Sequence, residues 1–210
     1  DLGAAVLFGE TTEVLGAERI LAARTASEGA GEKLLRKVGE MEARANASGV
    51  DMRGGQPTAG NIAGGITTIE EKSLGAVVKG GSRPIRGVLE YGERPPGPGL
   101  YFMDSPGREM EFLTGIVAGG SQIVLFSTGL GAPQGFPIAP VLKITGNSRT
   151  FREMREHMDV DVSGIIEGSE TAEEARKRIV EEIFAVASGK RTRAEIVGYD
   201  AAGVNANIYA

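Results

Sequence analysis

The chain has 210 residues, no cysteine and a formal net charge of −5. This length allows one sizeable hydrophobic core, so we expect a single domain over residues 1–210. The acidic balance argues against nucleic acid and anionic membranes as partners, and the missing cysteine excludes disulfides and suits the cytoplasm. No apolar run approaches the ~20 residues of a membrane span, so no membrane partner is expected.

The N-terminal third is predicted to hold one strand followed by helices. Residues 4–8 form a short apolar run that stops at Gly9 and Glu10. Neither Met nor a signal-peptide pattern precedes this run, so we expect the chain to continue a longer polypeptide. Helical periodicity then predicts a packing helix whose apolar face carries four regularly spaced side chains, namely Leu34, Leu35, Val38 and Met41.

A glycine-rich segment, residues 52–65, interrupts the helical pattern. It lacks a hydrophobic period, and its polar side chains fit either contact with a polar ligand or a flexible tether. Thr68 and Glu71 then match a capping box at the start of a helix, which would leave a charged first turn facing solvent. Residues 76–81 and 85–91 are expected to be short strands or extended segments.

Three further apolar runs, residues 99–103, 122–126 and 141–144, lack polar alternation, which is typical of strands buried on both faces. Each ends abruptly in small or polar residues. Open α/β sheets bind ligands just beyond the carboxyl ends of their parallel strands. We therefore expect the functional site at these three ends.

Asp104 follows the first of these strands, and Pro106 suits the first turn of a helix. Asp104 is therefore either a helix cap or a carboxylate directed into a cleft. Beyond the second strand, residues 127–135 contain a Gly-x-Gly pattern. They lead to another strand instead of a helix, which excludes the dinucleotide-binding motif. The turn is either an oxyanion-binding turn or a plain crossover.

Lys143 lies within the third run, where a charge is unexpected. It is either a buried lysine suited to acid–base chemistry or an outward-facing residue of an edge strand. Beside His157, Asp159 and Asp161 offer either oxygen ligands for a hard cation or, more commonly, a hydrogen-bonded turn.

Several strings in this chain resemble the C-terminal catalytic region of the altronate/galactarate dehydratase family, to which sulfolactate sulfo-lyase large subunits belong. They include FMDSPG, TGIVAGG, STGLGAPQG and PVLKITGN, and they follow one another in the same order over nearly the whole chain. The resemblance implies an α/β fold with a Rossmann-like, mostly parallel sheet, an unusual crossover and helices on both faces. It also implies that this chain is the C-terminal part of a longer polypeptide.

The same resemblance implies a lyase that dehydrates a sugar acid of the altronate or galactarate type to a keto-deoxy acid, assisted by a divalent metal, usually Fe²⁺ and alternatively Mn²⁺ or Mg²⁺. Such chemistry needs a base for the α-proton, groups that hold the enediolate and an acid or metal that helps hydroxide leave. The residues that this resemblance and the strand ends nominate fall into three roles: Lys72, Lys143 and Glu71 for catalysis, Asn61, Thr128, Gly129, Gly131 and Asn147 for substrate binding, and Asp104 and Glu10 for the metal.

Two alternatives stay open: a sulfo-lyase that releases sulfite from sulfolactate, and a fragment that binds a sugar acid without catalysis. The family's cysteine-containing motif lies upstream of residue 1, and Leu130 stands where many members carry Arg. Expected partners are a sugar-acid substrate, the N-terminal part of the same polypeptide or a small companion subunit, and further copies of the chain in a homo-oligomer.

Overall fold

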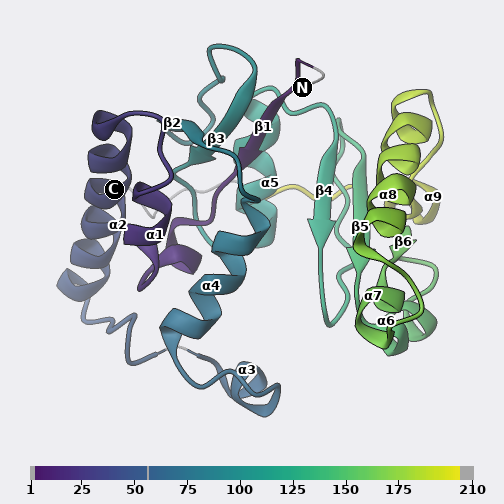
Figure 1. Cartoon of the computed structure of the whole chain (residues 1–210), viewed down its shortest axis with the longest axis horizontal. Coiled ribbons are helices and arrows are strands. Elements are labelled where there is room, and N and C mark those ends of the chain that lie inside the picture. The colour runs from purple at the N-terminus through teal and green to yellow at the C-terminus, as the bar shows by residue number, and fades with distance from the viewer. Residues whose placement is uncertain (1–2, 56, 204–210) are drawn as a thin grey trace. The chain divides into compact units, whose positions relative to one another are not determined.

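The computed structural model describes residues 3–55 and 57–203. These residues form two compact units that meet in sequence between Gly120 and Ser121, here called unit 1 and unit 2. Each unit has a three-stranded sheet in which neighbouring strands run parallel (Figure 1). The expected α/β, Rossmann-like class with parallel strands and intervening helices is therefore confirmed.

The sheet of unit 1 has the order β1-β3-β2, with β1 at Ala5–Phe8, β2 at Ile85–Leu89 and β3 at Gly99–Met103. The last strand in sequence thus lies between the two earlier ones. Phe8 pairs in register with Phe102, and Leu89 pairs with Met103. All three strands therefore end at the same edge of the sheet.

Helices cover both faces of this sheet. Phe102 packs edge-on against Phe8 within a core that also contains Leu34 of the long helix α2. Met103, the next residue, points to the opposite face, where its side chain lies against Gly119 at the end of α5. The helical segments of unit 1 are η1 (Thr11–Val14), α1 (Glu18–Ala22), α2 (Glu28–Ala47), α3 (Ala59–Ala63), α4 (Ile69–Lys79) and α5 (Glu109–Ala118).

The expectation of an extended segment at residues 76–81 is wrong, because α4 continues to Lys79. Thr68 caps this helix by accepting a hydrogen bond from the N–H of Glu71. Ile69, Ser73 and Val77 then turn a buried face inward at helical spacing. Packing of this face outweighs the strand propensity of the paired valines.

The sheet of unit 2 has the order β4-β5-β6, with β4 at Val124–Ser127, β5 at Val141–Thr145 and β6 at Val160–Asp161. Leu142 packs with Val160 and Val186 in a small core beneath α8. The helices of this unit are α6 (Ser148–Glu153), α7 (Ser163–Glu167), α8 (Ala172–Ala187) and α9 (Arg193–Val197). No helix of the described residues is long and apolar enough to cross a membrane.

Candidate functional site

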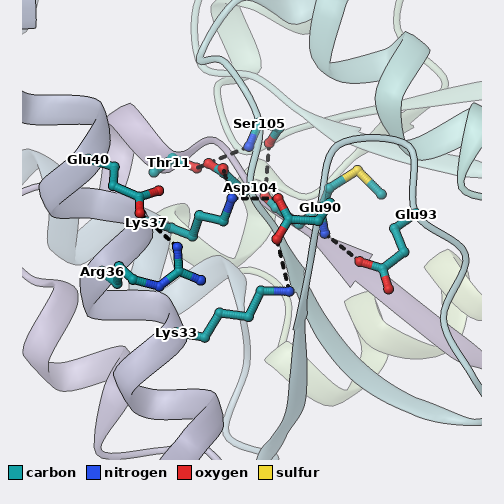
Figure 2. Close-up of polar contacts among 10 residues, drawn as sticks. Thr11, Lys33, Arg36, Lys37, Glu40, Glu90, Glu93, Asp104 and Ser105 are labelled. Atoms are coloured by element: carbon teal, nitrogen blue, oxygen red, sulfur yellow. Dashed lines mark hydrogen bonds and ion pairs between the residues drawn. The ribbon is translucent and has the colours of Figure 1, made fainter. Parts of the chain in front are cut away.

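The carboxyl ends of the unit 1 strands bring together polar side chains from distant parts of the sequence (Figure 2). Asp104 follows β3 directly and is 3% exposed. Its Oδ1 accepts a 2.7 Å hydrogen bond from the hydroxyl of Thr11, and its Oδ2 lies 3.4 Å from Nζ of Lys37 on α2. Both carboxylate oxygens are therefore engaged within the protein.

Ser105 joins the segment after β3 to the segment after β1. Its Oγ accepts a 2.8 Å hydrogen bond from the N–H of Glu10, and its own N–H donates to the Thr11 hydroxyl at 3.0 Å. The Thr11 N–H in turn donates to the Ser105 carbonyl at 2.8 Å. A Cβ on Gly9 would lie 2.5 Å from Ser105 Oγ, so this close approach needs glycine.

Two lysines one helical turn apart on α2 extend this cluster to the end of β2. Lys37 Nζ lies 2.5 Å from one oxygen of Glu90, and Lys33 Nζ lies 3.0 Å from the other. Burial by itself lowers the pKa of Lys37, but the carboxylates of Glu90 and Asp104 raise it by more. The pKa of Lys37 is therefore raised above the ordinary value for lysine. The group stays a cation that links two carboxylates (Figure 2).

Glu10 has a left-handed backbone, with φ of 67°, which is uncommon for a residue with a side chain. Burial raises the pKa of its carboxyl to about 7, opposed mainly by the positive charge of Lys79. Lys72 also acts on this carboxyl, and its Nζ forms a 3.0 Å ion pair with Glu13. Glu10 and Lys72, nominated from the sequence for different roles, therefore share one electrostatic environment.

Two other nominated residues of unit 1 bond to their neighbours in sequence. Glu71 is exposed, and one of its oxygens accepts hydrogen bonds of 2.7 Å from both the N–H and the hydroxyl of Thr67. Asn61 closes a capping box with Thr58 at the start of α3. The structure places neither side chain in the Asp104 cluster.

In unit 2 the substrate-binding nominees do come together, at the carboxyl ends of β4 and β5. The Thr128 hydroxyl accepts a 3.0 Å hydrogen bond from the N–H of Gly131. The carbonyl of Gly129 accepts from Asn147 Nδ2 at 3.1 Å and from the Thr150 hydroxyl at 2.7 Å. We call residues 128–135 the glycine turn. These hydrogen bonds connect the start of the glycine turn to the N-terminus of α6.

Lys143, in the central strand β5, is fully buried. Its Nζ donates a 3.0 Å hydrogen bond to the carbonyl of Gln134 in the glycine turn. Burial lowers the pKa of this lysine, while the negative charges of Asp159 and Glu195 act in the opposite direction. Lys143 is therefore buried in a central strand and is not an outward-facing residue of an edge strand, while its part in acid–base chemistry stays a prediction.

The pair of aspartates near His157 serves the backbone. Asp159 accepts hydrogen bonds of 2.7 Å from the N–H groups of Lys143 and Arg193, and Asp161 accepts one of 2.9 Å from Ser163. Of the two interpretations, these contacts favour the hydrogen-bonded turn.

The model of the family described as D-galactarate/altronate dehydratase, C-terminal, matches residues 1–209. The chain belongs to this family. It is 42% identical to the (2R)-sulfolactate sulfo-lyase subunit beta of Chromohalobacter salexigens, over 94% of this chain and 51% of the relative. It is 34% identical to the galactarate dehydratase and to the altronate dehydratase of Escherichia coli, over 90% of this chain and 36% and 38% of the relatives.

The chain therefore spans about a third to a half of the length of these relatives. The dehydratases and the sulfo-lyase subunit are all named for elimination reactions, so the family is one of lyases. Family membership confirms the resemblance that the FMDSPG and STGLGAPQG strings indicated.

Asp104 and Glu10, which were expected to bind the metal, do not lie in a cluster of metal-binding side chains from the described part of the chain. Among the described residues, no group of three or more His, Cys, Asp or Glu side chains is placed to hold a metal ion. Asp104 is engaged by Thr11 and Lys37, and lysines act on Glu10 from two positions. The described residues thus do not fit a complete metal site, and the divalent metal stays a prediction from the family resemblance.

Sequence reasoning missed the partners of Asp104. Lys37 follows the buried Leu34 by three residues and precedes the buried Met41 by four, so it borders the apolar face of α2. A cation at such a boundary, rather than in the middle of a polar face, is a signal of a buried ionic partner. No sequence pattern indicates that the hydroxyls of Thr11 and Ser105 lie near Asp104. Their proximity follows from the pairing of β1 with β3.

Proposed function

We propose that this chain is the C-terminal part of a lyase that removes the proton next to a carboxylate and expels a leaving group from the adjacent carbon. The match of residues 1–209 to a family of dehydratases carries this proposal. Polar groups at the carboxyl ends of parallel strands in each unit support the proposal, because α/β sheets bind ligands beyond these ends.

The proton-transfer group we nominate is Glu10. Its backbone is left-handed and its N–H donates to Ser105 Oγ, and strained backbone of this kind concentrates at functional sites. Lys72 and Lys79 act on its carboxyl, so positive charge is at hand for a developing enediolate. A pKa of about 7 suits a group that both accepts and returns a proton near neutral pH.

The first substrate class is a sugar acid of the altronate or galactarate type. Removing the proton from the carbon next to the carboxylate and losing hydroxide from the following carbon gives an enol, which takes a solvent proton on carbon and releases its hydroxyl proton to become a 2-keto-3-deoxy acid. The overall reaction releases one water. A divalent metal, Fe²⁺ by family resemblance, would assist the departure of hydroxide and would need ligands from outside the described residues.

The second substrate is sulfolactate, and a specific observation favours it. The identity to the sulfo-lyase subunit is 42%, against 34% to the two Escherichia coli dehydratases, and it extends over a similar share of this chain. The same α-proton abstraction followed by loss of sulfite gives enolpyruvate and then pyruvate. The two substrates thus share their first step and differ in the leaving group.

The remaining polypeptide, or a companion subunit, is proposed to complete the site. The sulfo-lyase relative is named a subunit, and each relative is about two to three times as long as the matched region. Assembly into a homo-oligomer stays a prediction that sedimentation of the full-length protein would test.

The test is a product assay of the full-length protein with Fe²⁺ under reducing conditions. A 2-keto-3-deoxy acid from altronate or galactarate supports the first substrate, and sulfite with pyruvate from sulfolactate supports the second. Glu10→Gln should lower kcat at least about 100-fold, the contribution typical of a general base. Glu32→Gln, on an exposed position of α2, is the matched control and should leave the rate unchanged. Absence of turnover on all three acids would contradict the proposal.

A further inference from the structure

Lys143 has an unusual setting for a lysine. It occupies the middle of β5, the central strand of unit 2, and its side chain is fully buried. Within the described residues, its ammonium group donates to one acceptor, the backbone carbonyl of Gln134, and forms no ion pair with a carboxylate. A buried cation that lacks a directly paired anion lowers stability relative to an apolar residue of similar size. Stability alone therefore does not account for a lysine here.

The carbonyl that Lys143 binds belongs to the glycine turn. This turn is fastened at its start by Asn147 and Thr150, which both donate to Gly129 O. At its other end Gly135 packs so closely against Ala194 of α9 that a Cβ would lie 2.8 Å from the alanine side chain. Between these two contacts, the hydrogen bond from Lys143 Nζ to the Gln134 carbonyl connects the turn to β5.

The glycine turn also contains a polar atom whose partner is not among the described residues. Gln134 Oε1 is buried and has no hydrogen-bond partner there. At the other end of the turn, Gly129 and Leu130 are exposed, and Leu130 is 86% exposed. A turn with exposed residues that is anchored at both ends has the features of a ligand-binding loop, and the Gln134 oxygen left unpaired by the described residues can accept a hydrogen bond from a hydroxyl of such a ligand.

We propose that Lys143 is a positioning residue of the glycine turn, holding residues 128–135 in the conformation that binds an anionic ligand, without itself touching that ligand. This inference rests on the proposed lyase function. It replaces the catalytic role nominated from the sequence, because Nζ is buried and directed at the Gln134 carbonyl. The anchored turn places the peptide groups of Gly129 and Leu130 in a fixed geometry for an anionic ligand.

The first experiment separates positioning from catalysis in the full-length protein. Lys143→Met keeps the length and loses the donor, Lys143→Gln keeps a donor but cannot act as a base, and Lys177→Met on the exposed face of α8 is the matched control. We expect Lys143→Met to raise KM at least tenfold with kcat within about threefold, and Lys143→Gln to recover part of the loss. The pH profile of kcat should keep its shape in both variants.

The opposite pattern would overturn the proposal. A fall in kcat of at least 100-fold, loss of one limb of the pH profile and rescue by added methylamine would identify Lys143 as the catalytic base. Unchanged kinetics in Lys143→Met, equal to those of the Lys177 control, would show that the contact with Gln134 has no functional role.

A second readout does not depend on turnover. Hydrogen exchange of the full-length Lys143→Gln and Lys143→Met variants should be at least tenfold faster in peptides covering residues 128–135, with exchange in unit 1 unchanged. If the wild-type protein has no lyase activity while exchange rises in this way, the proposed function fails and the positioning role stands. If exchange at residues 128–135 does not rise in either variant, the positioning role is wrong. Should Lys143→Met not fold, Lys143→Gln alone decides both experiments.

Discussion

The hydroxyl of Thr11 donates a 2.7 Å hydrogen bond to Oδ1 of Asp104, although 93 residues separate them in sequence. The contact joins the segments that follow β1 and β3, two parallel strands paired in register up to Phe8 and Phe102. It lies in a buried region where an unmade hydrogen bond is costly. The geometry at the carboxyl edge of unit 1 therefore depends on this pair.

Thr11→Val removes this donor and the acceptor for the Ser105 N–H while keeping the shape of the side chain. Because Asp104 is buried, we expect the free energy of unfolding to fall by about 1–3 kcal/mol. Urea denaturation measures this change. Thr12→Val, at the neighbouring position, makes neither of these contacts and should shift the unfolding free energy by less than about 0.5 kcal/mol. Equal effects at the two positions would show that the Asp104 contact is unimportant.

Lys37→Met leaves the carboxylate of Asp104 buried without its cation. Loss of one partner of a buried pair costs about 3 kcal/mol. Lys33→Met is the control, because among the residues that the structure describes Lys33 forms its ion pair with the half-exposed Glu90, and exposed pairs contribute about 0–1 kcal/mol. Thermal unfolding of both variants tests the difference, and a larger loss in Lys33→Met would contradict the assigned roles.

Glu10 should make stability depend on pH. Its pKa is raised from 4.5 to about 7 in the folded chain, so the folded state binds the proton more tightly than the unfolded state. The resulting stabilisation is complete below about pH 4.5 and is lost as pH rises through about 7. Relative to Glu10→Gln, the wild-type protein should therefore lose about 3 kcal/mol between these limits. Urea denaturation from pH 4.5 to pH 8 measures it, and parallel curves for the two proteins would contradict the raised pKa.

Gly131→Ala should destabilise unit 2, whereas Gly129→Ala should not. Gly131 has φ of +89°, and an added Cβ would overlap the sulfur of Met154, while a Cβ on Gly129 would meet nothing within 4 Å. The left-handed backbone alone costs an alanine about 1–2 kcal/mol. Denaturation monitored by hydrogen exchange in peptides from residues 121–203 measures both variants. Equal stability of the two would show that the turn rearranges to accept a side chain.

Strands β3, β4 and β5 could be predicted from sequence because each lies in a short apolar run with an abrupt polar end. The run at residues 99–103 matches β3 at both ends, and residues 141–144 match β5 to within one residue. β6, with two residues, is too short for a periodic pattern and was not predicted. Residues 76–81 were misassigned because β propensity reflects only the local residues. The buried face that stabilises the helix extends over all eleven residues of α4.

The candidate site was predictable in position but not in partners. Asp104 and the group of Thr128, Gly129, Gly131 and Asn147 were nominated because they follow strands, and the structure places them at strand ends. The hydrogen-bond partner of Asp104 depends on strand order, since Thr11 reaches it because β3 pairs with β1. Lys37 bridges Asp104 and Glu90, and its place beside the apolar face of α2 indicates a buried ionic partner without identifying which carboxylates it binds.

The α-proton abstraction is tested most directly with substrate that carries deuterium on the carbon next to the carboxylate. The full-length protein is incubated in ordinary water with the labelled acid that it turns over, altronate, galactarate or sulfolactate, and the product is examined by mass spectrometry. Abstraction by a protein base that exchanges with solvent predicts a product without the label. A product that keeps all of the deuterium on the neighbouring carbon would demonstrate an internal hydrogen shift and would contradict the proposed mechanism.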